Sequence, residues 1–273
     1  MLALTHLLLA RTQLYTQGDA GVTIAAMHAK VYGIPGSHPV RTGLLMLERK
    51  EIPYDLIDMP SVLCRPYLRA VGFPGPTVPA VKLDGRRVQT TRGLSRVLDE
   101  VEPDPPLFPR DQEARRQVED TERWGDEVLQ PVPRRLSYAA LTRDRSPLAS
   151  FLERPLFDVP PKAVAVTAGP ILALSKRVNK ASDATARADL EALPGMLDHV
   201  DALIAEGVIG GAEPNAADFQ IATSVRLMLN FDDLAPAIIG RPAAEHSQRL
   251  VAHYPGNVPP VLPPEWLEPL RRP

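Results

Sequence analysis

Near its beginning the chain switches between two kinds of hydrophobic spacing. Residues 30–33 and 54–58 are short runs in which apolar and polar positions alternate, as they do in strands. Between them, apolar residues follow Ser37 at helical spacing until the charged run 48–50. Ser37 is a favourable N-cap, and Pro39 is tolerated in the first turn of a helix. The pattern predicts strand, helix and strand, joined by a connection short enough for a parallel crossover.

A hairpin and a second helix follow. Residues 78–83 are predicted to form a strand that begins with proline, and Asp84-Gly85 is a strong hairpin signal before the partner strand 86–89. Helical spacing then runs from residue 94 to residue 101, and a proline-rich stretch stops it. These elements predict an α/β domain over residues 29–102 and a linker over residues 103–112.

After the linker the pattern is helical. One apolar stripe covers residues 114–128 and is expected to end near Pro131, and a second covers residues 186–204. The run 215–218, Asn-Ala-Ala-Asp, has the spacing of a capping box, with Asp in place of Glu, ahead of a further apolar stripe. We therefore predict an all-helical domain over residues 113–254.

The two ends of the chain differ from the domains. Residues 1–28 are expected to form an extension without stable structure. Their apolar stretch 2–10 is followed, not preceded, by Arg11, which is the wrong order for a secretory signal. The proline-rich residues 255–273 are expected to run extended over the surface, with Trp266 as an anchor.

Composition narrows the classes of function. The chain has 273 residues, with 31 Lys and Arg against 33 Asp and Glu, so it lacks the positive surplus of a typical nucleic-acid-binding protein. A single cysteine, Cys64, excludes an internal disulfide and a thiolate-rich zinc site. No apolar run approaches the ~20 residues that span a bilayer. Asp189, Asp198 and His199 are interpreted as charges on an exposed helix face, and we expect no metal site.

Four stretches of the sequence match a known family in their order. They are Val31 to Arg41, Thr77 to Val81, Val88 to Leu94, and Gly211 to Phe219. In this order they resemble the glutathione transferase superfamily, serine-type. The resemblance implies an α/β thioredoxin-like N-terminal domain followed by an all-α C-terminal domain.

The resemblance also implies a role for Ser37. In serine-type members a hydroxyl at this position donates to the sulfur of glutathione and favours the nucleophilic thiolate over the thiol. The alternative is that Ser37 only caps the helix that follows it. Tyr32 is the competing hydroxyl, and its position on a strand favours a packing role.

Other positions are implied as contacts for the thiol peptide. Val78-Pro79 resembles the cis-proline corner of the family, where the Val78 main chain can pair with the cysteinyl unit. Thr91 keeps a hydroxyl where the family binds the γ-glutamyl carboxylate, whereas Thr90 replaces a longer Glu or Gln. Either threonine could instead be a helix cap. Arg41 and His38 are expected to supplement anion binding; the alternative is that each is a solvated residue on the helix face.

The resemblance thus implies a cytoplasmic detoxification enzyme that conjugates glutathione to an electrophilic small molecule as a homodimer. We expect it to bind neither nucleic acid nor a membrane. The electrophile is expected near Trp124, Leu136 and Tyr138. One alternative is a non-catalytic thiol-binding or protein-interaction module on the same fold, because Thr90 departs from the family pattern. A further alternative is a transferase that uses a related low-molecular-weight thiol.

Overall fold

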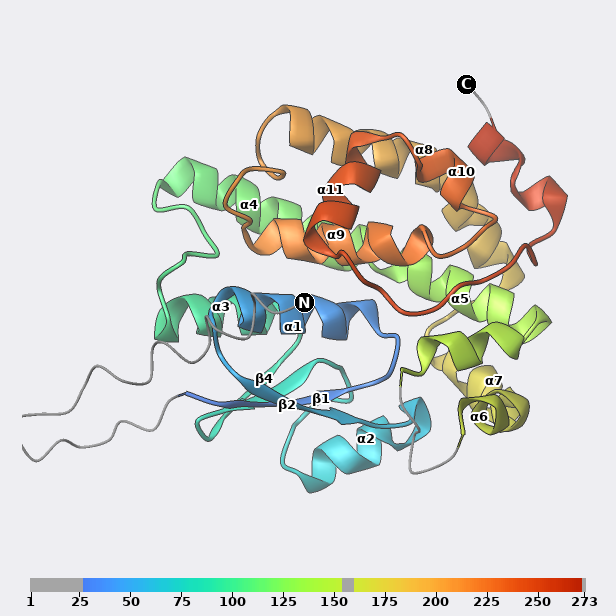
Figure 1. Ribbon diagram of the computed structural model, residues 1–273, viewed down its shortest axis with the longest axis horizontal. Coiled ribbons are helices and arrows are strands. Elements are labelled where there is room, and N and C mark those ends of the chain that lie inside the picture. The colour runs from blue at the N-terminus through green and yellow to red at the C-terminus, as the bar shows by residue number, and fades with distance from the viewer. Residues whose placement is uncertain (1–26, 154–159, 272–273) are drawn as a thin grey trace, which may run out of the picture.

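The computed structural model describes residues 27–153 and 160–271, so the expectation for residues 1–26 lies outside the described part. A small sheet with three helices is followed by a larger helical part (Figure 1). The elements of the first part are β1 (Ala29–Gly33), α1 (His38–Arg49), β2 (Tyr54–Asp58), α2 (Ser61–Ala70), β3 (Ala80–Leu83), β4 (Arg86–Gln89) and α3 (Thr91–Val101). The predicted strands and helices of this domain are confirmed.

The sheet has the order β2-β1-β3-β4, with β1 parallel to β2 and antiparallel to β3. Tyr32 lies opposite Ala80, and Ala80 lies opposite Gln89, so β1 and β4 end where β3 begins. Helices α1 and α3 cover the face toward the helical part, and α2 covers the other face (Figure 1). The segments that follow β1, precede β3 and follow β4 therefore meet at one edge of the sheet.

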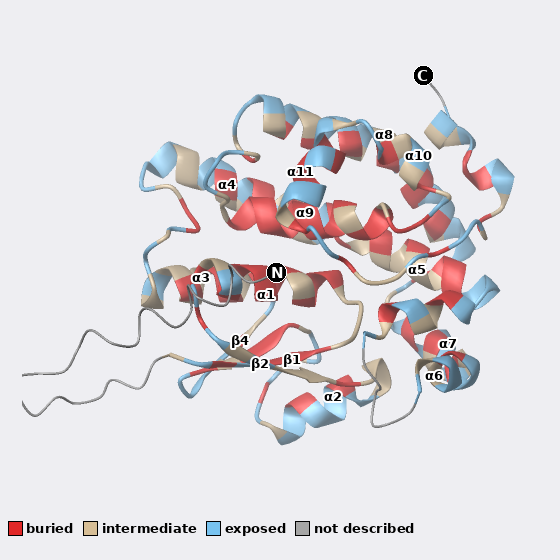
Figure 2. Cartoon of the chain, viewed as in Figure 1, coloured by how far each residue is buried: buried red, intermediate tan, exposed pale blue. Residues whose placement is uncertain are grey.

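The second part is helical. Its elements are α4 (Gln112–Trp124), a π-helical turn (Gly125–Leu129), α5 (Pro131–Arg143), a 3-10 helix (Ser146–Phe151), α6 (Pro161–Thr167), α7 (Gly169–Val178), α8 (Asp183–Ala205), α9 (Ala216–Met228), α10 (Ala235–Ile238), α11 (Pro242–Leu250) and 3-10 helices Pro264–Trp266 and Glu268–Arg271. Helix α9 packs against α1 and is buried on nearly every side (Figure 2). The architecture is a thioredoxin-like domain followed by a helical domain, as predicted. None of the helices in the described ranges has the length and hydropathy needed to cross a membrane.

The helical stretch that was expected to end near Pro131 ends at Leu129, and α5 begins at Pro131 without a loop between them. The Gln130 amide donates to the Gly125 carbonyl oxygen over 2.8 Å, which links α4 to α5 through the π-helical turn. Pro131 opens α5 because a proline in the first turn removes no hydrogen bond that the helix needs.

The C-terminal residues are also different from the expectation. They do not run extended along the surface: Val258 pairs with Phe231, and two 3-10 turns follow. The expectation of Trp266 as an anchor is confirmed, because its ring is buried and the Arg143 guanidinium lies 4.5 Å from the ring centroid.

Two further sequence expectations concern carboxylates. The capping box is confirmed: Asn215 Oδ1 accepts from the Asp218 amide over 3.2 Å, and Asp218 Oδ2 accepts from the Asn215 amide over 2.7 Å. Asp189 is not on an exposed face. It is buried and accepts from Arg135 Nε over 2.6 Å, because a carboxylate on the apolar side of α8 needs a charged partner.

Candidate functional site

The start of α1 leaves a hydroxyl free. Ser37 is the N-cap residue, with φ −78° and ψ 115°, but its side chain makes no capping hydrogen bond. A cap oxygen normally accepts from the second or third residue of the helix, and here the second residue is Pro39, which has no N–H. Ser37 thus occupies the cap position without contributing a side-chain capping bond. Among the described residues nothing bonds to its hydroxyl.

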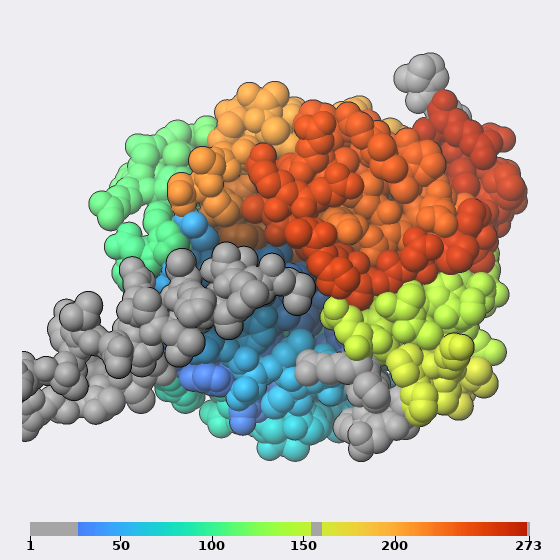
Figure 3. Space-filling model, in the orientation of Figure 1, coloured from blue at the N-terminus to red at the C-terminus, as the bar shows by residue number. Residues whose placement is uncertain are grey.

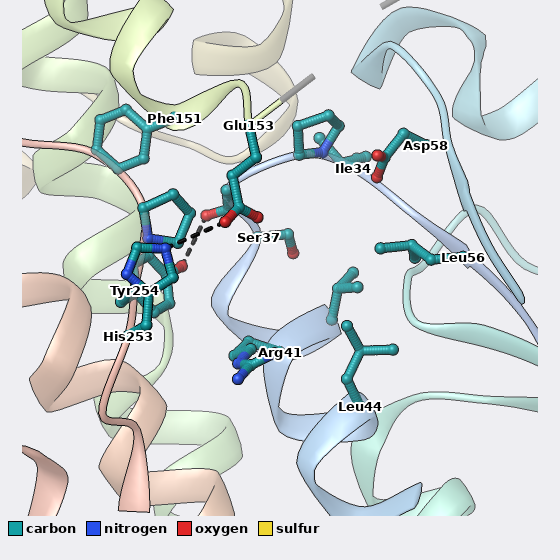
Figure 4. A pocket seen from close by; sticks show the side chains of 14 residues that line it. Ile34, Ser37, Arg41, Leu44, Leu56, Asp58, Phe151, Glu153, His253 and Tyr254 are labelled. Carbon is teal, nitrogen blue, oxygen red and sulfur yellow. Dashed lines mark hydrogen bonds and ion pairs between the residues drawn. The ribbon is translucent and has the colours of Figure 1, made fainter. Parts of the chain in front are cut away.

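This hydroxyl lies in a hollow with a cavity volume of about 100 Å³. Ser37 and Arg41 line it from α1, Asp58 from the end of β2, and Phe151 from the 3-10 helix (Figure 4). The rest of the lining is Ile34, Pro35, Gly36, Val40, Leu44, Leu56, Glu153, His253, Tyr254 and Pro255. Pockets that enclose a whole small molecule measure roughly 300–1,000 Å³, so this hollow holds part of a ligand.

The C-terminal segment forms one wall of the hollow. The Tyr254 hydroxyl donates to the Gly36 carbonyl oxygen over 2.7 Å, and burial raises the pKa of this phenol. At Gly256 a Cβ would lie 2.4 Å from the Phe151 ring, so only glycine permits this approach. Figure 3 shows the C-terminal residues (red) against the yellow-green residues near position 150. The site is thus assembled from both domains.

The sequence did not point to Phe151, Glu153, His253 or Tyr254. They lie in or beside stretches without a periodic pattern, and only the fold brings them to the start of α1. The one local signal was Gly256, whose φ of 94° marks a turn that L-residues rarely adopt.

The charges around the hollow are unevenly paired. The Arg41 guanidinium makes no hydrogen bond to any described residue. Its Nη1 lies 3.6 Å from Glu48 Oε1, and its Nε is buried without a partner. Glu48 in turn accepts from the Tyr54 hydroxyl over 2.8 Å. Burial, together with this hydrogen bond, raises the pKa of Tyr54 to about 12. At the rim, His253 Nε2 lies 3.1 Å from Glu153 Oε1.

The Val78-Pro79 peptide bond is cis, as the family resemblance implied. Among the described residues, no hydrogen bond involves the main-chain N–H or carbonyl oxygen of Val78. The Pro79 ring lies against α1 at Gly43, where a Cβ would be 3.2 Å from it. The corner therefore presents two unpaired backbone groups at the edge of the sheet where Ser37 also lies.

The two threonines at the start of α3 differ. Thr90 caps the helix: its Oγ1 accepts from the Gly93 amide over 3.1 Å, and its backbone has φ 70°. Thr91 is 2% exposed, and its hydroxyl has no partner among the described residues. Gln89, which sequence reasoning missed, accepts from the Gly75 amide over 2.8 Å and holds the loop before the corner.

The expected residues thus form two groups at one edge of the sheet. Ser37 and Arg41 line the hollow on the β2 side. Val78, Pro79, Thr90 and Thr91 do not line it, and they lie at the β3 and β4 side of the edge.

The residues expected to face the electrophile do not line the hollow either. Trp124 packs edge-on against His199, with ring centroids 4.5 Å apart, and Leu136 is buried in the core. The Tyr138 hydroxyl accepts from Nδ2 of Asn179, the residue that follows α7, over 3.4 Å.

His38, beside Ser37, is a structural residue. Its Nε2–H donates to the Gln130 carbonyl oxygen over 3.0 Å and joins α1 to the helical domain. Burial, with a smaller contribution from the Arg134 charge, lowers the pKa of His38 to about 3. It therefore carries no charge near neutral pH and does not supplement anion binding.

Comparisons with known proteins agree with this architecture. Residues 31–106 match the family profile "Glutathione S-transferase, N-terminal domain". A search of curated proteins finds no match. Among solved structures, FzlA from C. crescentus is 16% identical, with a TM-score of 0.58 and coverage of 89% of this chain and 99% of that one.

Two further solved structures share the fold. A glutathione S-transferase from Sinorhizobium meliloti is 18% identical (TM-score 0.54), with 89% of this chain and 99% of that one covered. A maleylacetoacetate isomerase from Anaeromyxobacter dehalogenans, with glutathione bound in its active site, is 17% identical (TM-score 0.50), with 91% and 98% covered. The chain therefore has the two-domain fold of the glutathione S-transferase superfamily, and its first domain matches the N-terminal domain of that family.

Proposed function

We propose that this protein is a serine-type glutathione transferase, which conjugates glutathione or a related low-molecular-weight thiol to an electrophilic small molecule. The observation that carries the proposal is the Ser37 hydroxyl at the open start of α1. It has no partner in residues 27–153 and 160–271, and it faces a hollow between the domains. We also propose that the protein acts as a homodimer in the cytoplasm, as the family usually does.

The chemistry follows from the position of Ser37. Its hydroxyl donates a hydrogen bond to the sulfur, and the start of α1 adds a partial positive charge with no acidic side chain in the first turn to offset it. Both effects stabilise the thiolate, which has lost its proton to solvent. The sulfur then attacks the electrophilic carbon, forms the C–S bond, and a leaving group departs with its bonding electrons.

Unpaired groups beyond the hollow support binding of the rest of the thiol peptide. The free N–H and carbonyl oxygen of Val78 at the cis-Pro79 corner suit the cysteinyl unit, which would add to the sheet edge like a short strand. The start of α3 at Thr91 suits a carboxylate. The isomerase with bound glutathione is a protein of the same fold that binds this peptide.

A second candidate function rests on Thr90. Its hydroxyl is committed to capping α3, so it offers the γ-glutamyl amine neither an acid nor an amide. This favours either a different thiol or a non-catalytic module that binds thiols or another protein. The fold is the same for all these functions, so the site must discriminate between them.

One experiment separates the candidates. The thiol pKa of bound glutathione, measured by thiolate absorbance, and the conjugation rate with chlorodinitrobenzene are compared for wild type, Ser37→Ala and Ser146→Ala. Ser146 is an exposed serine whose hydroxyl donates to Asp144, and it does not line the hollow, so it is the control. The proposal expects a lowered thiol pKa that returns toward its free value only in Ser37→Ala. Wild type that binds glutathione without conjugation supports the non-catalytic module, and binding of another thiol alone supports the related transferase.

A further inference from the structure

Arg41 is a charged group of the hollow whose guanidinium lies near Glu48 but makes no hydrogen bond with the described residues. A guanidinium has five N–H donors, and none of those of Arg41 reaches a described acceptor within hydrogen-bond distance. Its side chain is 31% exposed, and it lines the hollow one helical turn after Ser37. The two residues share a face of α1, because the Arg41 amide donates to the Ser37 carbonyl oxygen over 3.0 Å.

Each acid near Arg41 already has another partner. Glu48 accepts a hydrogen bond from the Tyr54 hydroxyl and lies 3.6 Å from Arg41. Glu153 lies 3.1 Å from His253, and Asp58 also has an interaction within the protein. Figure 4 places Glu153 and Asp58 on the opposite side of the hollow from Arg41. The positive and negative ends of the hollow are therefore separate.

We propose that Arg41 binds a carboxylate of the acceptor, so that the electrophiles of this protein are aromatic or other apolar acids. This inference rests on the proposed function. A planar carboxylate accepts two parallel hydrogen bonds from a guanidinium, which fixes its orientation as well as its charge. The apolar body of the acceptor contacts Ile34, Leu56 and Phe151, and its reactive carbon lies near the sulfur at Ser37.

The opposite wall orients such an acceptor. The carboxylates of Glu153 and Asp58 repel a second negative charge, so the acid group is directed to the Arg41 end of the hollow. A positively charged acceptor would be attracted to that wall and repelled by Arg41. The charge of the preferred acceptor, negative or positive, is therefore a measurable property of the site.

The test uses three chloronitrobenzenes with the same ring positions that carry a carboxylate, a carboxamide or an aminomethyl group. In wild type the proposal expects kcat/KM with glutathione to fall in the order acid, amide, amine. In Arg41→Gln the acid-to-amide ratio should fall about tenfold or more, because charge-assisted hydrogen bonds are among the strongest in proteins. Arg41→Lys keeps the positive charge but cannot donate two parallel hydrogen bonds, so it should retain part of the acid-to-amide ratio. A preference for the amine, or a ratio unchanged in Arg41→Gln, overturns the inference.

Arg116→Gln is the matched control. Arg116 is an exposed helical arginine that pairs with a glutamate on α4, so its loss should leave the ratio unchanged. Binding of nitrobenzoate, which has no leaving group, is measured by calorimetry on the same variants. If nitrobenzoate binds wild type about tenfold more tightly than Arg41→Gln while no conjugation occurs, the proposed function fails and the acid site stands. If all three probes are conjugated at similar rates, the proposed function stands and the acid site at Arg41 fails.

Discussion

The starts of α9 and α1 are two solutions to the same problem, the unbonded amides at the beginning of a helix. At α9 side chains bond to the free amides: Asn215 and Asp218 cap each other. Asp218 also accepts from the amide of Gly210, in the loop before the helix, over 2.7 Å. At α1 the serine in the cap position contributes no side-chain bond. The comparison teaches that a closed helix start serves stability, whereas an open one leaves groups available for a ligand.

The largest expected effect tests the open start. Ser37→Ala should lower kcat/KM for conjugation about a hundredfold to a thousandfold, as loss of a single donor to a developing anion does elsewhere. The free energy of unfolding should change by no more than about 0.5 kcal/mol, because no cap bond is lost. Steady-state kinetics and urea unfolding on the same preparation measure both. A large loss of stability would show that Ser37 is a cap after all.

Lowering the pH should reduce the free energy of unfolding, because it weakens the His38 contact between α1 and the helical domain. The pKa of His38 is about 3 in the folded protein and near 6.5 when unfolded, so the unfolded chain binds the proton first. The contribution of neutral His38 is complete above pH ~6.5 and is lost as the pH falls from there toward 3, by up to about 1.4 kcal/mol per pH unit. Urea unfolding between pH 7 and pH 5 measures it.

His38→Gln is the control for this pH dependence, because its amide can still donate to the Gln130 carbonyl oxygen and does not titrate. Glu122 and Asp126, whose pKa values are raised by burial, contribute with the opposite sign and cancel when the two proteins are subtracted. If the unfolding free energy depends on pH equally in wild type and His38→Gln, His38 is not the group responsible.

The closed start should behave in the opposite way to Ser37. Asp218→Ala removes the acceptor for two amides, and we expect a loss of about 1–2 kcal/mol in unfolding free energy. Thermal unfolding at a fixed protein concentration measures it, with exposed Asp120→Ala on α4 as the control. The thiol pKa of bound glutathione should not change. An unaltered melting temperature would remove the argument that this capping box stabilises the domain.

The smallest effect concerns the wall behind the open start. Tyr254→Phe leaves the Gly36 carbonyl oxygen without its donor and should cost about 1 kcal/mol of stability. Because the turn before Ser37 is then held less firmly, kcat should fall a few-fold while the affinity for the thiol is kept. Stopped-flow measurements of binding and turnover distinguish this result from simple unfolding.

The first domain could be predicted because its signals are local. Asp84-Gly85 specifies the hairpin, and the apolar alternation around it specifies the strands within a few residues. The helical domain was predicted where an apolar stripe was long, as over residues 186–204. The helix that begins at Pro131 was missed, because a proline that follows one helix and a proline that opens the next have the same local pattern.

The site could be predicted only in part. Pro39 indicates an open helix start, although its position alone did not lead to that prediction. A proline in the second helical position removes an amide that Ser37 would otherwise cap. The roles of Phe151 and Tyr254 depend on contacts between distant parts of the chain, and no spacing in the sequence encodes such contacts. Whether a buried threonine such as Thr91 has a partner is likewise decided by tertiary packing.

The Tyr254–Gly36 hydrogen bond has a consequence for the order in which the protein matures during synthesis. A ribosome releases the N-terminal domain first, and domains generally fold as they emerge. The wall around the hollow, however, needs residues 253–255. Tyr254 follows Gly36 by 218 residues and is therefore synthesised after α1 to α11. A nascent or prematurely terminated chain can therefore contain a folded sheet and a complete α1 and still lack the finished hollow.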